Sequence, residues 1–342
     1  MKAAYFDNHG GLDVLKYGEI PTPKFAETEA LVKVEACGLN HIDIWVRQGL
    51  PNVRTPMPHV TGAEIVGTVS KCGSKVTHVK PGDRVLVAPG INCGVCAHCS
   101  AGRDSICREF SIMGVQRNGG YAEYAAAPGR NLIPVSSKLK PEEWAAVPLV
   151  FLTAWHMLVT RAVLKAGETV LIQGGGSGVG SAAIQVAKLC GATVFATVGS
   201  EMKQKKARAM GADWVINHAK RDFADEIQRL TEGRGVDVVF EHVGPATWRG
   251  SVKSLARGGR LVTCGATTGP IVELDLRFFF TKELSVMGCY MGGRRELDDV
   301  LQLVEQGRLK PVVDTLFPLK DAMKAQAKME SRNFFGKLVL RV

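Results

Sequence analysis

The pattern of hydrophobic positions changes once along the chain, at about residue 150. Before residue 125, apolar residues form short runs broken by turns, which predicts strands at 29–36, 63–69, 84–88 and 121–127. Pro81-Gly82-Asp83 and Asn118-Gly119-Gly120 are turn signals between these runs. Helical periodicity is scarce here, so this part is predicted to be an irregular, β-rich domain.

After residue 150, apolar runs alternate with helical patterns. The predicted strands are 169–173, 192–197, 214–216, 236–241, 260–264 and 284–288, with helices such as 180–190, 202–210 and 222–231 between them. Continuous apolar strands are typical of a parallel sheet covered on both faces. The fold class is therefore α/β, with a doubly wound Rossmann sheet at 150–290. Residues 291–342 end in a strand at 337–341 and are expected to join residues 1–149.

Composition restricts the kind of protein. The chain has 43 Lys and Arg against 33 Asp and Glu, and its positive residues are spread out, with the densest group at 203–208. This favours attraction for a phosphorylated small molecule over nucleic acid. The N-terminus has no signal-peptide apolar region, and no apolar run approaches the ~20 residues that span a bilayer. We expect a soluble, cytoplasmic protein with no membrane partner.

A glycine-rich loop follows the first strand of the second region. Residues 174–180 read Gly-Gly-Gly-Ser-Gly-Val-Gly, between the predicted strand and a helix. Such a turn lets the backbone approach a pyrophosphate, and the helix N-terminus supplies amide donors. We expect Gly175, Ser177, Gly178, Val179 and Gly180 to bind a dinucleotide, although Ser177 replaces the second glycine of the fingerprint. A tight turn without ligand is the alternative.

The end of the second strand distinguishes NAD from NADP. An NAD-binding chain is expected to have Asp or Glu there for the ribose hydroxyls, but this position is Val198. Ser200 can donate a hydrogen bond and Lys203 can bind a 2′-phosphate, whereas the acidic Glu201 argues slightly against NADPH. These residues favour NADPH, and a solvated surface role is the alternative for Lys203.

Four cysteines form the most specific local pattern. Cys93, Cys96, Cys99 and Cys107 have spacings typical of a closed, tetrahedral structural zinc site at about 90–108. An iron–sulfur cluster fits less well, because the last interval is seven residues and no proline follows it. His98 is an alternative ligand. We predict one structural Zn²⁺ per chain; the other five cysteines are expected to be core thiols.

These motifs together resemble the medium-chain dehydrogenase/reductase superfamily, which includes zinc alcohol dehydrogenases and quinone oxidoreductases. The resemblance covers essentially the whole chain, including the cysteine lobe, the glycine loop and the final Gly336-Lys337. It implies a GroES-like catalytic domain at 1–149 and 291–342. It also implies a homodimer or homotetramer, paired through the edge near Phe278-Phe279-Phe280 and 284–288.

The alcohol dehydrogenases of this family also hold a catalytic zinc, and its three ligand positions are here Asn40, Ala63 and Leu149. Asparagine, alanine and leucine do not form a zinc site as a set. The segment from Gly38 to Asp43 instead resembles the metal-free quinone oxidoreductases. These usually lack the cysteine lobe, so the chain combines features of both branches. A metal site rebuilt from His41, Asp43, His59 and Glu64 is a further alternative.

The resemblance implies roles for several residues. Expected catalytic residues are Asn40, as a donor to a developing oxyanion, with His59 and Thr153; expected cofactor-binding residues beyond the loop are His41, Thr153, Ser200, Lys203, Val243, Gly265 and Lys337. Structural roles are the alternatives, namely turn capping for Asn40 and core packing for His59 and Thr153.

The expected function is an NADPH-dependent reductase that acts on a small-molecule substrate. It would transfer hydride to a quinone or to an activated C=C bond in an enone, enal or enoyl thioester, without a catalytic metal. Three alternatives stay open: a zinc-type alcohol dehydrogenase, a metal-free carbonyl or alcohol enzyme, and a non-catalytic, crystallin-like NADPH-binding protein.

Overall fold

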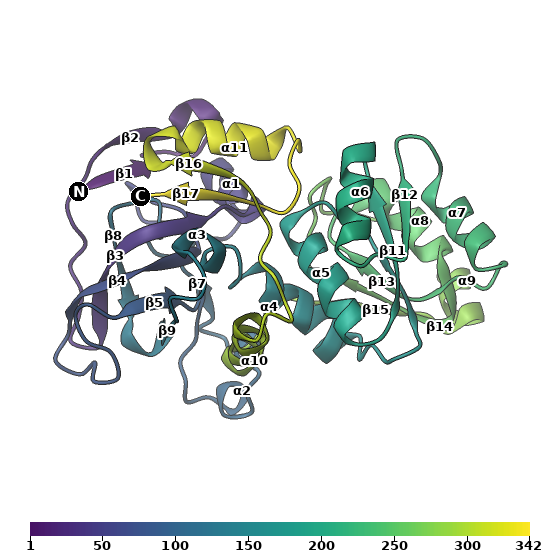
Figure 1. Ribbon diagram of the computed structural model, residues 1–342, viewed down its shortest axis with the longest axis horizontal. Helices are drawn as coiled ribbons and strands as arrows, with labels where there is room; N and C mark the ends of the chain where they lie inside the picture. Colours follow the sequence, from purple (N-terminus) through teal and green to yellow (C-terminus); the bar gives the residue numbers. More distant parts are fainter. The chain divides into compact units, whose positions relative to one another are not determined.

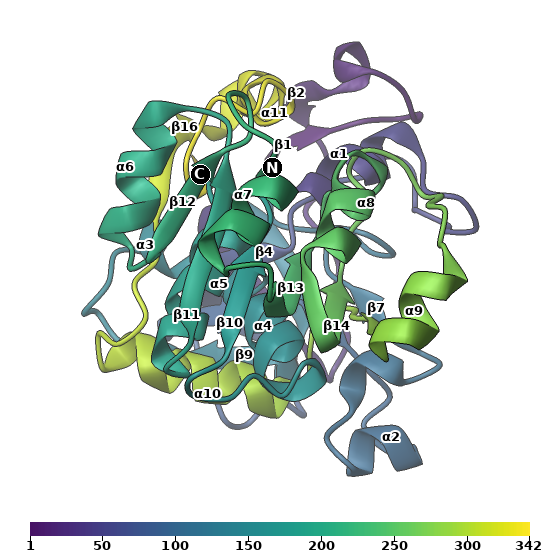
Figure 2. The same cartoon turned by 90° about the vertical axis from the view of Figure 1, so that its right-hand side faces the viewer.

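The computed structural model describes residues 1–342, which form two compact units. Unit 1 comprises Met1–Leu149, Gly293–Glu305 and Lys310–Val342, and unit 2 comprises Val150–Gly292 and Gln306–Leu309. Figures 1 and 2 show their helices and strands along the chain. No helix is long and apolar enough to cross a membrane.

Unit 2 contains a six-stranded parallel sheet in the order β12-β11-β10-β13-β14-β15. Its strands are β10 (Thr169–Ile172), β11 (Thr193–Val198), β12 (Trp214–Asn217), β13 (Val236–Glu241), β14 (Leu255–Thr263) and β15 (Ser285–Gly288). Its helices are α4 (Val150–Trp155), which continues as a π-helix over His156–Arg161, α5 (Gly178–Leu189), α6 (Glu201–Ala209), α7 (Phe223–Leu230), α8 (Pro245–Lys253) and α9 (Leu276–Lys282). The strand order confirms the predicted doubly wound sheet.

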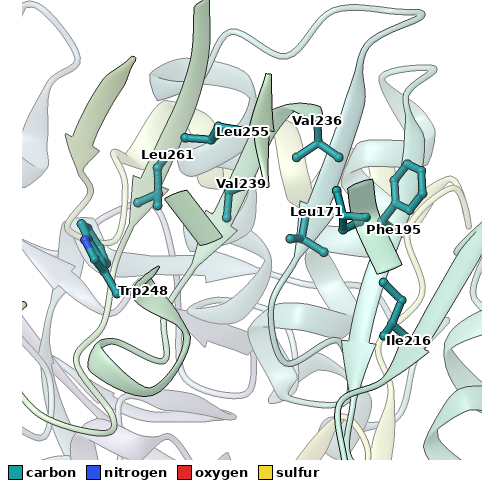
Figure 3. Close-up of a cluster of buried hydrophobic side chains, with 9 residues drawn as sticks. Leu171, Phe195, Ile216, Val236, Val239, Trp248, Leu255 and Leu261 are labelled. Carbon is teal, nitrogen blue, oxygen red and sulfur yellow. The ribbon is translucent and has the colours of Figure 1, made fainter. Parts of the chain in front are cut away.

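Helices cover both faces of this sheet, with α5 and α6 on one face and α7 and α8 on the other (Figure 1). Beneath α7 and α8 lies a buried cluster of Leu171, Phe195, Ile216, Ile227, Val236, Val239, Trp248, Leu255 and Leu261 (Figure 3). Five strands and both helices contribute to it. Because both faces are covered, the strands are apolar throughout rather than alternating.

Unit 1 is built on a sheet in the order β16-β17-β3-β4-β5-β9, with β8 also paired to β3. Its strands are β1 (Lys2–Tyr5), β2 (Lys16–Glu19), β3 (Glu29–Gly38), β4 (Glu64–Cys72), β5 (Arg84–Val87), β6 (Gly90–Ile91), β7 (Ser111–Ile112), β8 (Tyr124–Pro128), β9 (Leu132–Pro134), β16 (Val313–Pro318) and β17 (Lys337–Arg341). Its helices are α1 (His41–Gln48), α2 (Ala97–Ser100), α3 (Pro141–Trp144), α10 (Arg294–Glu305) and α11 (Ala322–Glu330), and short 3₁₀ turns occupy Leu12–Val14, Asp104–Ile106, Gly129–Asn131 and Leu319–Asp321.

Strand register in unit 1 brings distant segments together at Gly38. This residue pairs with Val339 of β17 on one side and with Glu64 of β4 on the other. A Cβ at Gly38 would lie 2.2 Å from the carbonyl oxygen of Ala145, so the close approach requires glycine. The chain that follows Gly38 therefore begins α1 beside both β4 and β17.

Helix α1 was not expected, because the sequence shows little helical periodicity there. Ile44 and Val46 are buried, as in an ordinary amphipathic helix, but so are Asp43 (1% exposed) and Arg47 (0%). Two charged residues on the buried face interrupt the apolar repeat from which a helix is recognised. Arg47 donates to Gln326 and Glu330, which compensates the burial of its charge.

Candidate functional site

Asn40 occupies the N-cap position of α1, in an extended conformation (φ −135°, ψ 156°). Its backbone N–H donates to the Asp43 carboxylate at 2.8 Å, which is one half of a capping box. Asn40 as a whole is 6% exposed. The capping interaction therefore involves its backbone, and its carboxamide contacts other partners.

The Asn40 carboxamide lies between a carboxylate and an ammonium. Its Nδ2 donates to Glu64 Oε2 at 2.9 Å, and its Oδ1 accepts from Lys337 Nζ at 2.7 Å. Lys337 also forms an ion pair with Glu64 Oε2 at 2.5 Å and donates to the Leu39 carbonyl. Since a carboxylate only accepts and an ammonium only donates, these two partners determine the orientation of the amide.

Asp43 has neutral hydrogen-bond donors around it. Tyr121 Oη donates to it at 2.8 Å and the Gly62 N–H at 3.2 Å, in addition to the Asn40 N–H. Burial raises the pKa of the Asp43 carboxyl to about 6 despite these donors. Burial also raises the pKa of Tyr121 well above its usual range, so its hydroxyl remains a donor.

The structure places His59 differently from the catalytic expectation. His59 is 0% exposed, its Nε2 contacts the Gly114 carbonyl at 3.0 Å, and its ring packs edge-on against Phe6. Burial lowers the pKa of its imidazole. His59 has no exposed surface in unit 1, which favours the structural alternative, because a catalytic group has to reach a reacting atom.

Lys337 also departs from expectation. A phosphate contact would need an accessible ammonium, but this residue is 3% exposed and its Nζ is within hydrogen-bonding distance of Leu39, Asn40 and Glu64. An ammonium has three hydrogens, and three acceptors account for them. The location of Lys337 therefore argues against a cofactor contact.

Two further expected residues lie on helices. His41 is the first residue of α1, partly exposed, and its ring lies edge-on to Trp45 with centroids 5.1 Å apart. Thr153 lies in α4 of unit 2 and is 5% exposed.

In unit 2, the glycine loop connects β10 to α5. Ser177 is the N-cap of α5, and its Oγ accepts from the Gly180 N–H at 2.9 Å. A Cβ at Gly180 would lie 2.3 Å from the Gly174 carbonyl oxygen, so helix and strand approach too closely for any other residue. Backbone N–H groups at the start of α5 and the close turn fit a dinucleotide pyrophosphate.

A chain of buried hydrogen bonds supports this loop, and the sequence did not reveal it. The Gly174 N–H donates to Thr197 Oγ1 (3.0 Å), which donates to Gln173 Oε1 (2.7 Å); Gln173 Nε2 donates to Ser251 Oγ (3.0 Å), which donates to Glu241 Oε2 (2.7 Å). It joins the carboxyl ends of β10, β11 and β13. In the sequence, the only sign of this network was that polar residues stand at the ends of three predicted strands.

Glu241 also organises the segment that contains Val243, an expected cofactor contact. Its carboxylate accepts from the backbone N–H groups of Val243 (2.6 Å) and Gly244 (3.2 Å) and from Thr247 Oγ1 (2.9 Å). Gly265, also expected to contact the cofactor, follows β14; a Cβ there would lie 2.7 Å from the His242 carbonyl oxygen. These segments lie at the carboxyl edge of the sheet, where doubly wound folds bind ligands.

The expected NADPH-selecting residues begin helix α6. Ser200 is its N-cap, with Oγ accepting from the Lys203 N–H at 3.3 Å. His218, which sequence reasoning missed, follows β12 beside Gly199. Burial lowers the pKa of His218, and the nearby Lys203 ammonium lowers it further. Lys203 therefore carries the positive charge at this place, and the neutral His218 ring can donate one hydrogen bond, which suits an anion such as a 2′-phosphate.

The four expected cysteines converge in unit 1. All four sulfurs lie within 4.8 Å of one another, with Cys93–Cys99 at 3.8 Å, Cys96–Cys99 at 3.5 Å and Cys107–Cys93 at 3.6 Å. Sulfurs at about 2.3 Å from one tetrahedral ion lie about 3.8 Å apart. Backbone N–H groups of Val95 and Cys96 lower the pKa of Cys93 to about 6. His98 is not part of this group of sulfurs.

Comparisons with known proteins agree with this geometry. The family described as "Alcohol dehydrogenase GroES-like domain" matches residues 26–137, and "Zinc-binding dehydrogenase" matches residues 178–306. A quinone oxidoreductase from Sus scrofa is 31% identical over 350 residues, covering 99% of this chain and 97% of the relative. The chain belongs to the medium-chain dehydrogenase/reductase superfamily. It is therefore an oxidoreductase by family.

Both branches of the medium-chain dehydrogenase/reductase superfamily are among its relatives. An alcohol dehydrogenase from Geobacillus stearothermophilus is 33% identical, with 96% of each chain covered. The crystal structure of an NAD-dependent alcohol dehydrogenase superposes with a TM-score of 0.96 at 42% identity, covering all of both chains. Membership confirms the GroES-like and Rossmann fold and leaves the substrate to be inferred from the site.

Proposed function

We propose that this medium-chain dehydrogenase/reductase is an NADPH-dependent reductase of quinones or activated C=C bonds that uses no catalytic metal. The contact between Lys337 Nζ and Asn40 Oδ1, at 2.7 Å, is the main support. Asn40 stands at the first zinc-ligand position of the alcohol dehydrogenase branch, and its Oδ1, the atom that would bind a metal, accepts a hydrogen bond from the Lys337 ammonium instead. Ala63 and Leu149 offer no ligand at the other two positions.

The loop residues Gly175, Ser177, Gly178, Val179 and Gly180 would hold the pyrophosphate. Ser200 and Lys203 would contact the 2′-phosphate, and His41, Thr153, Val243 and Gly265 are proposed as the remaining contacts. A bound NADPH supplies the hydride. The fit rests on the close approach at Gly180, on the Ser177 cap and on Val198, where an acidic residue would select NAD.

Asn40 is the proposed donor to the substrate. Reduction of a conjugated C=C bond places negative charge on the carbonyl oxygen of the acceptor, and a preorganised N–H stabilises that charge. One Nδ2 hydrogen of Asn40 is donated to Glu64, and the structure gives the other no acceptor. A proton from solvent then completes the reduction at the adjacent carbon.

Turnover measurements test this proposal directly. The purified chain is assayed for NADPH oxidation with quinones, enones, enals and acyl-CoA thioesters, and with aldehydes as the comparison class. We expect turnover with at least one of the first four classes, and a loss of about 10²- to 10³-fold in kcat for Asn40→Ala. Activity confined to aldehydes or alcohols, or an unchanged Asn40→Ala variant, contradicts it. Tight NADPH binding without turnover would indicate a non-catalytic protein instead.

A zinc-type alcohol dehydrogenase is the second candidate, favoured by the 42% identity to an NAD-dependent alcohol dehydrogenase. The two candidates differ in metal content. The proposed reductase holds one structural zinc per chain, at Cys93, Cys96, Cys99 and Cys107, whereas an alcohol dehydrogenase of the two-zinc type holds a second. Two zinc ions per chain would favour the second candidate.

We also propose a homodimer or homotetramer that pairs through β15. This strand is the edge of its sheet, and apolar residues near it are exposed, among them Phe280 (70%) and Val286 (39%). An open strand edge beside exposed apolar side chains favours pairing with a second copy.

A further inference from the structure

The buried ion pair of Lys337 and Glu64 is costly to the fold. Their side chains are 4% and 0% exposed. Removing two charges from water costs several kcal/mol per ion, and apolar side chains of similar size often pack at least as well in such places. The pair therefore points to a role beyond stability. Both of its charged groups contact the Asn40 carboxamide.

The pair controls which way the Asn40 carboxamide faces. Rotation of the amide by 180° would point its NH₂ group at the Lys337 ammonium and its oxygen at the Glu64 carboxylate, so both contacts would become repulsive. The observed orientation satisfies both, at 2.7 Å and 2.9 Å. The two charges thus keep the second Nδ2 hydrogen in one position.

The ammonium also polarises the amide. A positive charge at Oδ1 draws electron density from the carbonyl and, through amide resonance, from Nδ2, which makes the Nδ2 hydrogens stronger donors. Hydrogen bonds in a chain strengthen one another in this way, and the effect is larger where water is excluded. Asn40 is 6% exposed, so this condition is met.

We propose that Lys337 is a positioning residue for the reaction: its ammonium orients and polarises the Asn40 carboxamide, so that Asn40 donates a strong, preoriented hydrogen bond to the oxyanion of an α,β-unsaturated carbonyl or quinone substrate. The inference rests on the proposed function. It assigns to Lys337 an action through Asn40, without contact to substrate or cofactor.

Three substitutions separate charge from hydrogen bonding at position 337. Lys337→Met removes both, Lys337→Gln retains a donor for Asn40 Oδ1, and Lys337→Arg retains the charge. We expect kcat to fall about 10- to 100-fold in Lys337→Met, less in Lys337→Gln, and to recover largely in Lys337→Arg. NADPH affinity, measured by fluorescence titration, should stay within about twofold. If Lys337→Met does not fold, the Gln and Arg variants decide the question.

A double-mutant cycle tests whether Lys337 acts through Asn40. If it does, Asn40→Ala/Lys337→Met is no slower than Asn40→Ala, because the donor on which the lysine acts is already gone. Lys328→Met is the matched control, since Lys328 pairs with Asp314 in the same unit and has no contact with Asn40. This control should leave kcat unchanged. Additive losses in the cycle overturn the proposal.

A measurement that needs neither substrate nor cofactor follows the polarisation itself. In a ¹H–¹⁵N spectrum of protein labelled at asparagine, the Asn40 side-chain signals are those missing from Asn40→Ala. We expect them to move upfield in Lys337→Met and to stay near their wild-type positions in Lys337→Arg. Unchanged signals in Lys337→Met overturn the proposal.

The outcomes distinguish this inference from the function on which it rests. If the wild-type chain shows no reductase turnover, both the proposed function and the role of Lys337 are wrong. Wild-type turnover with a slow Asn40→Ala variant and additive Lys337 effects leaves the proposed function standing and removes the role of Lys337.

Discussion

Glu64 and Lys337 form an ion pair in the interior of unit 1, with Oε2 and Nζ 2.5 Å apart. Removing the carboxylate leaves a buried ammonium without its counter-charge, and we expect Glu64→Leu to lower the free energy of unfolding by about 3–5 kcal/mol. Urea denaturation measures this. Glu19→Gln, which breaks the exposed Lys2–Glu19 pair, is the control and should cost less than about 1 kcal/mol. Equal losses in the two variants would contradict the prediction.

Asp43 should make stability depend on pH in an unusual direction. Its pKa rises from 3.8 to about 6 in the folded state, so folding favours the protonated carboxyl. That contribution is present below about pH 4 and is lost as the pH rises through 6, a change of about 3 kcal/mol at 1.36 kcal/mol per pKa unit.

The comparison with Asp43→Asn isolates this contribution, because the amide does not titrate and the wild type and the variant have all other carboxyl groups in common. The difference in unfolding free energy, wild type minus variant, should fall by about that amount between pH 4 and pH 7. A difference that is constant with pH would show that the Asp43 carboxyl is not shifted.

Lys203 should select NADPH over NADH. We expect Lys203→Ala to raise the KM for NADPH about 10- to 100-fold, the loss typical of one hydrogen bond to a charged group, and to leave the KM for NADH unchanged. Lys205→Ala, an exposed lysine on the same helix, is the matched control. Parallel changes with both cofactors would mean that Lys203 acts on helix α6 rather than on a 2′-phosphate.

The cysteine cluster should hold one zinc ion per chain. Elemental analysis of the wild type is expected to give a ratio near one, and Cys99→Ser to reduce it strongly. Cys264→Ser, a substitution outside the cluster, should leave the ratio unchanged. Removal of the ion should lower the Tm, because the thiolates then lose the ligand that joins them. A full zinc content in Cys99→Ser would place the metal elsewhere.

The edge at β15 should form the interface between copies. Phe280→Asp places a charge among exposed apolar side chains, and we expect it to shift the mass measured by light scattering toward that of one chain. Tyr17→Asp, which alters another exposed aromatic residue (47%), is the control. An unchanged mass for Phe280→Asp would exclude this edge as the interface.

Features that depend on neighbouring residues could be predicted from the sequence. The glycine loop is a strand, a turn and a helix in succession, and Ser177 and Gly180 contact each other within three residues. The cysteines span only 93–107, and their sulfurs meet as expected. Strand β17 was predicted at its observed bounds. Strand β14 begins five residues before the expected start, because Gly258 and Gly259 are not typical of a strand.

Features that depend on distant pairing could not be predicted. Helix α1 was missed because its buried face includes Asp43 and Arg47, which also contact Tyr121 and Glu330 far away in the chain. Lys337 was expected near a phosphate, because nothing adjacent to it indicates that Glu64 is its counter-charge. The burial of His59 was also not visible in the sequence, because its partners Phe6 and Gly114 lie far from it along the chain.

The amino-acid sequence by itself determined the two folding patterns, the glycine loop and the cysteine cluster, since each follows from local spacing or residue type. Only the tertiary structure decided what surrounds Asn40. The register of β17, β3 and β4 places Val339, Gly38 and Glu64 side by side. Strand pairing between distant segments, and not any local motif, thereby put an ammonium and a carboxylate on the two ends of one amide.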